Sequence, residues 1–172
     1  MELEEKIIER EEKYKGDFLV LERVKVELPD GNNAERDIVR HPGAVAIVAF
    51  KDDNTILMVE QFRVALNQKM LEIPAGKLEK NEKPIDCAQR ELEEETGYKA
   101  KSLKHIGSIA TGAGFTDEII HIFKATELYK GEKGGDDDEF IDVSLYNIED
   151  IKKLIKEGKI IDTKTISSFM FL

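Results

Sequence analysis

The pattern of apolar and polar residues predicts a β-rich domain with few helices. Residues 44–50 form a continuous apolar run, which is typical of a strand buried on both faces. A polar turn separates this run from the next predicted strand, over residues 55–62. Further strands are expected over 70–73, 100–110, 118–127 and 140–146. We therefore expect a mixed β-sheet with helices on its faces.

The N-terminal segment has a different pattern. Residues 2–13 are mostly charged, and their apolar residues Leu3, Ile7 and Ile8 fall on one helical stripe. This spacing predicts a short amphipathic helix, or a frayed one, at the start of the chain.

A hairpin is predicted directly after this segment. Residues 18–28 alternate between apolar and polar side chains, the turn residues 29–31 follow, and residues 34–40 form the returning strand. Both faces of this hairpin are polar, so it is not expected to form a layer of the main core. We therefore expect a small N-terminal lobe over residues 1–42 and a main domain over residues 43–172.

Three helices are predicted in the main domain. The first begins at Pro84, which suits the first helical position, and ends before Gly97, which suits the position after the last turn. Asn147 is expected to cap a second helix over residues 148–157. A short final helix is expected after Asp162.

The length and composition of the chain exclude several classes of function. A length of 172 residues fits one core, and a net charge of −10 argues against general binding of nucleic acid. No apolar run approaches the roughly 18 residues of a membrane span, and the acidic start lacks the apolar stretch of a signal peptide. The single cysteine, Cys87, excludes an internal disulfide and is expected to pack on the core side. These features predict a cytoplasmic protein.

The first predicted helix of the main domain concentrates carboxylates on one face. Glu91 and Glu95 are four residues apart, and Glu94 borders the same face, whereas Glu93 points elsewhere and should be solvated. Such like charges repel one another unless a cation joins them, and oxygen ligands suit Mg²⁺. The spacing therefore predicts a metal site, which most often serves phosphate chemistry.

The alternative explanation of a Glu-rich helix is a solvated acidic face. Here, however, Gly76, Glu82 and Arg90 accompany the carboxylates at fixed spacing. Arg90 is predicted to contact Glu82 or Glu94 and so to orient a ligating carboxylate. The backbone carbonyl of Ala75 is a further candidate ligand.

The full run from Gly76 to Tyr98 reads G-x5-E-x7-R-E-U-x-E-E-x-G-U, where U is a bulky apolar residue. It resembles the signature of the Nudix hydrolases, which cleave nucleoside diphosphates linked to another moiety. Outside this run, the resemblance is to the ADP-ribose pyrophosphatase branch, in residues 60–63, 71–76, 114–118 and 138–143.

The resemblance implies an α/β (α+β) fold in which a mixed β-sheet is sandwiched between helices, with an N-terminal antiparallel hairpin lobe. In that branch a swapped lobe of this kind commonly builds a homodimer. The implied activity is cleavage of ADP-ribose to AMP and ribose 5-phosphate with Mg²⁺, for which Mn²⁺ could substitute.

Position by position, the resemblance also implies a catalytic and metal-binding set that consists of Ala75, Arg90, Glu91, Glu94, Glu95 and Glu139. The carbonyl of Ala75 and the carboxylates of Glu91 and Glu95 would bind metal, with Glu94 close by. Glu139 would be the general base. The alternative for Glu139 is that it is one more charge in the solvated acidic run 136–139.

The implied substrate-binding residues are Phe18, Arg36, Arg63 and Glu118. The fixed charge and fork geometry of Arg63 suit a pyrophosphate or terminal ribose, although a surface arginine on an edge strand is the alternative. Phe18 would stack on adenine, and Arg36 would also reach substrate, unless both are structural. Glu118 is a second candidate base, or it braces the site.

One position departs from the branch. A proline usually precedes the glycine equivalent to Gly114, whereas this chain has Ala113. This difference leaves open another nucleoside diphosphate sugar, such as GDP-mannose, as the substrate. A Nudix-fold module that binds nucleotides without turnover is a further alternative, against which the complete set of carboxylates argues.

Overall fold

The computed structural model describes residues 3–132, 134 and 140–172. The chain divides into two compact units. The first comprises Met1–Gly43 and Ala110–Ile119, and the second comprises Ala44–Ile109 and Ile120–Leu172. Within the described residues, no helix is long and apolar enough to cross a membrane.

The first unit contains an antiparallel sheet of order β1-β2-β3. Its strands are β1 (Lys6–Lys15), β2 (Val20–Glu27) and β3 (Asn33–Arg40). The predicted hairpin is therefore confirmed as β2 and β3. Its turn depends on Gly31, which has a φ of +84° and donates its N–H to the carbonyl of Leu28 at 2.9 Å.

The prediction of a helix over residues 2–13 is wrong. These residues contribute β1, which pairs with β2 along the register from Lys6 opposite Glu27 to Lys15 opposite Val20. An isolated helix of this length is marginal in water, whereas a strand beside an existing hairpin gains a full ladder of backbone hydrogen bonds. A helical stripe of only three apolar residues stabilises this segment less than the backbone hydrogen bonds of the strand do.

The loop of residues 110–119 completes the first unit. The N–H of Val39 in β3 donates to the carbonyl of Phe115 at 2.7 Å. Arg40 pairs with Asp117 at 3.0 Å, and Asp117 also accepts the backbone N–H of His41 at 2.9 Å. These contacts join a segment far along the chain to the end of β3.

The second unit contains two sheets rather than one continuous mixed sheet. One has the order β7-β4-β9-β8 and includes β4 (Ala44–Ala49), β7 (Ala75–Lys77), β8 (Tyr98–Ala110) and β9 (Ile119–Lys130). It is mixed, because β4 pairs parallel with β9 and antiparallel with β7. The other is antiparallel, has the order β10-β5-β6, and includes β5 (Thr55–Arg63), β6 (Gln68–Glu72) and β10 (Asp142–Asn147).

Three α-helices and one short 3₁₀ turn, η1 (Val64–Leu66), accompany these sheets in the described residues. The α-helices are α1 (Pro84–Thr96), α2 (Ile148–Lys156) and α3 (Thr163–Ser168). Helix α1 begins at Pro84 and ends at Thr96, and Gly97 follows it with a φ of +72°. Asn147 caps α2, accepting the N–H of Glu149 at 3.0 Å. All three predicted helices of the main domain are therefore confirmed.

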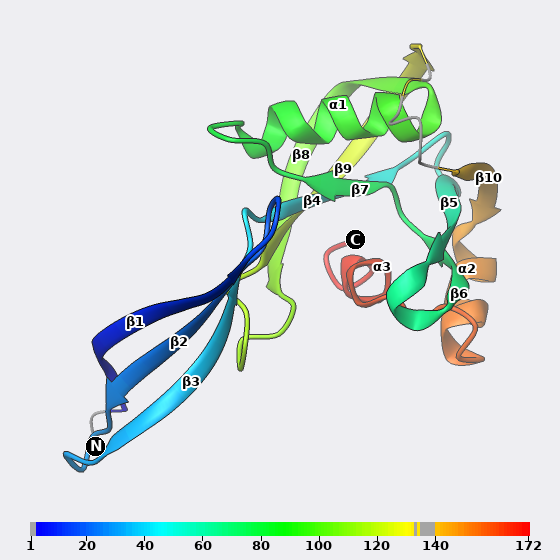
Figure 1. Ribbon diagram of the computed structural model, residues 1–172. Helices are drawn as coiled ribbons and strands as arrows, with labels where there is room; N and C mark the ends of the chain where they lie inside the picture. The colour runs from blue at the N-terminus through cyan, green and yellow to red at the C-terminus, as the bar shows by residue number, and fades with distance from the viewer. Residues whose placement is uncertain (1–2, 133, 135–139) are drawn as a thin grey trace. The chain divides into compact units, whose positions relative to one another are not determined.

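Strand β4 separates two apolar cores, as its continuous apolar run predicted. Val45, Ile47 and Ala49 pack in one core with Cys87, Ala88 and Leu92 of α1. Ala44, Ala46 and Val48 face the other core, which includes Ile151 of α2 and Ile166 of α3. Figure 1 shows α1 on one side of β4 and β7, with α2 and α3 on the other. Helix α1 and its carboxylates are thereby fixed against β4 and β7.

Candidate active site

The turn between β6 and β7 brings the backbone against α1. Gly76 in β7 lies so close to the carboxylate of Glu91 that a Cβ atom there would overlap it. The glycine is therefore required for close approach, and not for a positive φ. This contact explains why Gly76 and Glu91 occur together in the sequence run.

Glu95 is held on the same side of α1. Its side chain lies one turn after Glu91, and the residue is only 5 % exposed. Its Oε2 accepts the backbone N–H of Ala75 at 3.0 Å. The two predicted metal ligands from the helix and the Ala75 peptide are thus brought together by the structure.

Arg90 links three carboxylates of the site. Its Nη1 donates to Glu91 at 2.7 Å and to Glu94 at 2.9 Å. Its Nε and Nη2 form a fork with the two oxygens of Glu82, each at 2.9 Å. Both predicted contacts of Arg90, with Glu82 and with Glu94, are therefore present, and they orient Glu91 as well.

These contacts also set the protonation of the site. The hydrogen bond from Arg90 lowers the pKa of Glu82 to about 2, against an ordinary value of 4.5. The same pairing raises the pKa of Arg90. Burial, followed by the nearby Glu82, raises the pKa of the Cys87 thiol, so Cys87 stays protonated and unreactive at neutral pH. Its predicted core position is confirmed.

The chemistry of the donors fits a hard divalent cation, since all of them are carboxylate or carbonyl oxygens. As the side chains are arranged, the described residues contain no group of three or more His, Cys, Asp or Glu that could hold a metal ion. Arg90 engages Glu91 and Glu94, while the Ala75 N–H engages Glu95. Metal binding would therefore require these side chains to rearrange around the cation.

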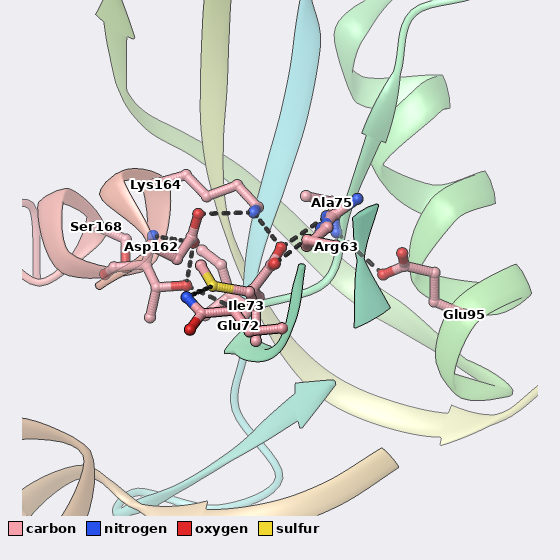
Figure 2. Close-up of polar contacts among 11 residues, drawn as sticks. Arg63, Glu72, Ile73, Ala75, Glu95, Asp162, Lys164 and Ser168 are labelled. Carbon is pink, nitrogen blue, oxygen red and sulfur yellow. Dashed lines mark hydrogen bonds and ion pairs between the residues drawn. The ribbon is translucent and has the colours of Figure 1, made fainter. Parts of the chain in front are cut away.

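Arg63 ends β5 and is paired with a buried carboxylate. Its Nε and Nη2 donate to the two oxygens of Glu72 in β6 at 2.9 and 2.7 Å (Figure 2). Hydrogen bonding to Glu72 raises the pKa of Arg63, and the nearby charge of Glu95 raises it further. Arg63 is therefore not a loose surface arginine, because its guanidinium is oriented within the field of the acidic site.

The remaining substrate candidates lie in the first unit. Phe18 makes an edge contact with His41 at a ring separation of 5.6 Å, and Glu118 accepts the hydroxyl of Thr111 at 2.6 Å. Arg36 pairs with Glu5 of the segment before β1 at 2.6 Å. His41 Nδ1 lies 3.5 Å from Glu118, so the first unit gathers Phe18, His41 and Glu118.

Glu139 and Glu93 belong to the two acidic segments of the chain. Glu139, the expected base, lies outside the described residues. Glu93 was expected to point away from the other carboxylates and to be solvated; it does point elsewhere, but its side chain is 22 % exposed and is held by two contacts. It pairs with Lys99 of β8 at 2.8 Å and accepts the backbone N–H of Glu132 at 3.1 Å, so it ties α1 to β8 and to the segment that follows β9.

Two charged residues near the site were not singled out from the sequence. Glu72 is 1 % exposed, and Lys164 of α3 forms a second ion pair with it. A carboxylate between the apolar residues Leu71 and Ile73 was a usable signal for Glu72. Lys164 gave no such signal, since it lies 92 positions away in the sequence.

The sandwich of sheets and helices, with the carboxylates of one helix against a glycine turn, defines a protein of the Nudix type. The family model described as NUDIX domain matches residues 40–169. The chain therefore belongs to the NUDIX family.

Individual relatives agree with this assignment. The chain is 47 % identical to a methanol dehydrogenase activator of Bacillus methanolicus, covering 98 % of this chain and 92 % of the relative. It is 46 % identical to an ADP-ribose pyrophosphatase of Bacillus subtilis, covering 99 % and 93 %. A crystal structure of an ADP compounds hydrolase has the same fold, with a TM-score of 0.87 at 19 % identity over 99 % of this chain and 94 % of that one.

Proposed function

We propose that this chain hydrolyses the pyrophosphate bond of ADP-ribose to give AMP and ribose 5-phosphate, with Mg²⁺ as its cofactor. The observation that carries the proposal is the meeting of Glu91 and Glu95 of α1 with the Ala75–Gly76 turn, in a chain that is 46 % identical to an ADP-ribose pyrophosphatase over nearly its whole length. Mn²⁺ is the expected substitute for Mg²⁺, because it also accepts oxygen ligands.

Each described residue of the site has a proposed role. Glu91, Glu95 and the carbonyl of Ala75 would hold the divalent ion, which supplies charge neutralisation at the phosphate oxygens. Arg90 would keep Glu91 and Glu94 oriented. Arg63 would bind the pyrophosphate or the terminal ribose, and Glu139 would take the proton from the attacking water.

The first unit has a proposed role in assembly and in binding the nucleoside. Its strand β1 is exposed along its whole length, including the apolar residues Ile7 and Ile8. We propose that β1 contributes to a homodimer, in which Phe18, Arg36 and Glu118 serve the substrate. Light scattering should give twice the chain mass for the native protein, and the double variant Ile7→Lys, Ile8→Lys should shift it to the monomer. A monomeric native protein would refute this assembly.

The activity is tested by mixing the purified protein with Mg²⁺ and a panel of nucleoside diphosphate sugars, followed by chromatography of the products. ADP-ribose should be consumed fastest, with AMP and ribose 5-phosphate in equal amounts. Faster consumption of GDP-mannose would make GDP-mannose the preferred substrate, while the proposed cleavage of a pyrophosphate bond would stand. Turnover of no member of the panel would favour a binding module.

We also propose that the protein acts in the cytoplasm, where the buried thiol of Cys87 would stay reduced.

A second candidate function is activation of a methanol dehydrogenase. It is favoured by the 47 % identity to a methanol dehydrogenase activator over almost the whole chain. Adding the protein with Mg²⁺ to a purified methanol dehydrogenase should then raise the rate of methanol oxidation. The variant Glu95→Gln tests whether such activation depends on hydrolysis. If this variant no longer activates the dehydrogenase, activation requires the hydrolytic site.

A further inference from the structure

A single buried carboxylate is shared by two cations beside the proposed site. Glu72 is 1 % exposed, and its two oxygens receive the fork of Arg63. The Nζ of Lys164 donates to the same Oε2 that accepts Arg63 Nη2. Figure 2 shows Glu72 between the Lys164 ammonium and the Arg63 guanidinium. Burial would raise the pKa of Glu72, but these two partners outweigh it and keep the carboxylate charged.

The two cations differ in their access to a substrate. The Arg63 side chain is 41 % exposed, whereas that of Lys164 is 10 % exposed. The fork with Glu72 uses two of the five N–H donors of the Arg63 guanidinium, so three remain for other acceptors. Lys164 is too buried to meet a substrate directly. Any influence of Lys164 on binding must therefore pass through Glu72.

Lys164 is itself fixed by α3. Its Nζ lies 3.0 Å from Asp162, the residue that caps the helix and accepts both the N–H and the hydroxyl of Thr165. The Thr165 hydroxyl accepts the backbone N–H of Ile73 at 2.9 Å. Helix α3 is thus attached to the segment that joins Glu72 to the Ala75 turn.

The net charge that Arg63 presents to a substrate depends on how Glu72 is shared between Arg63 and Lys164. With Lys164 present, the negative charge of Glu72 is divided between two cations, and Arg63 keeps part of its positive charge uncompensated. Without Lys164, the whole charge of a buried carboxylate would act on Arg63 alone. Arg63 would then be a weaker partner for phosphate, because its attraction to an anion would be offset by Glu72.

We propose that Lys164 is a positioning residue that acts through Glu72: it keeps Arg63 oriented and limits how far Glu72 offsets the attraction of Arg63 for an anionic substrate. The inference deepens the proposed function, on which it rests for the role of Arg63. It assigns substrate affinity, rather than the chemical step, to an ion pair between β6 and the C-terminal helix.

The test compares Lys164→Met and Lys164→Gln with the native protein in ADP-ribose hydrolysis. Both variants should raise KM by about tenfold, the size of one weakened charge-assisted contact, with kcat changed less than about twofold. The second variant can still hydrogen-bond to Glu72, so it removes chiefly the charge. The matched control is Lys152→Met, which breaks an exposed pair with Glu149 in α2 and should leave both constants unchanged.

The decisive comparison is the double variant Glu72→Gln, Lys164→Met. This double variant removes the negative charge of Glu72, which Lys164→Met leaves acting on Arg63 alone. It should therefore recover most of the substrate affinity that Lys164→Met loses. A purely structural role for Lys164 predicts no recovery, because the second substitution would only add damage. An unchanged KM in both single variants, or a double variant no better than Lys164→Met, would overturn the inference.

The same ratios can be measured without turnover. Calorimetry with α,β-methylene-ADP-ribose should give a tenfold weaker affinity for Lys164→Met and recovery in the double variant. If the native protein binds the analogue but hydrolyses no ADP-ribose, the proposed function fails while the inference stands on these affinities. If the native protein hydrolyses ADP-ribose and the variants match it in both assays, only the inference fails.

Discussion

The contact between Gly76 and Glu91 gives the sharpest test of the site geometry. The substitution Gly76→Ala adds one Cβ atom at a point occupied by the Glu91 carboxylate. Backbone lies on one side of this contact, so the side chain of Glu91 has to move. Alanine is otherwise favourable in a strand interior, where glycine is destabilising by about 0.5–1 kcal/mol. We therefore expect a change in activity without loss of the fold.

The magnitude follows from the interactions that Glu91 would lose. Its hydrogen bond from Arg90, at 2.7 Å, is charge-assisted and worth about 1.5–3 kcal/mol. If that amount is lost in the transition state, kcat/KM falls by about tenfold to a hundredfold, since about 1.4 kcal/mol corresponds to a factor of ten. A displaced metal ligand would add to this loss.

The assay is steady-state hydrolysis of ADP-ribose over a range of Mg²⁺ concentrations, together with thermal unfolding. Gly76→Ala should require more Mg²⁺ for half-maximal rate and should unfold within a few degrees of the native protein. The matched control is Gly158→Ala, at a φ of +70° with no neighbour near the added atom. This control should lose about 1 kcal/mol of stability and keep full activity. Native kinetics in Gly76→Ala would refute the close approach of Gly76 to Glu91.

Three further predictions concern residues of α1 and of the segment directly before it. Glu95→Gln should lower turnover by orders of magnitude while leaving the circular dichroism spectrum unchanged, and Mg²⁺ should raise the melting temperature of the native protein but not of this variant. The lowered pKa of Glu82 means that its stabilising effect is full above pH 4.5 and is lost as the pH falls toward about 2, so Glu82→Gln should flatten the acid limb of a stability–pH curve. Full activity in the first variant, or an unchanged acid limb in the second, would contradict these assignments. A thiol reagent should modify Cys87 only after unfolding, because burial raises its pKa, and rapid modification of the folded protein would contradict that burial.

The parts of the fold that the sequence predicted are those with a local cause. The buried strand β4 follows from an uninterrupted apolar run, and α1 follows from Pro84 and Gly97 at its ends. Strand β1 was missed because its reason is not local: it forms by pairing with β2, and its own residues are exposed and mostly charged. The three-residue strand β7 was missed because pairing with β4 alone defines it.

The candidate site shows the same division. The spacing of Glu91, Glu94 and Glu95 on one helix, and of Arg90 beside them, could be read from the sequence because a helix fixes it. The pairing of Glu72 with Lys164 could not, because it joins β6 to α3 across most of the main domain. Ion pairs between distant segments depend on how the elements pack, which the order of residues does not state.

The central claim is that the carboxylates of α1 support metal-dependent cleavage of a pyrophosphate. The most direct measurement is the release of AMP and ribose 5-phosphate from ADP-ribose by the purified native protein, in Mg²⁺ and again with excess EDTA. We predict equal amounts of both products in Mg²⁺ and no release with EDTA. No product in Mg²⁺, or the same rate of release in EDTA, would contradict it.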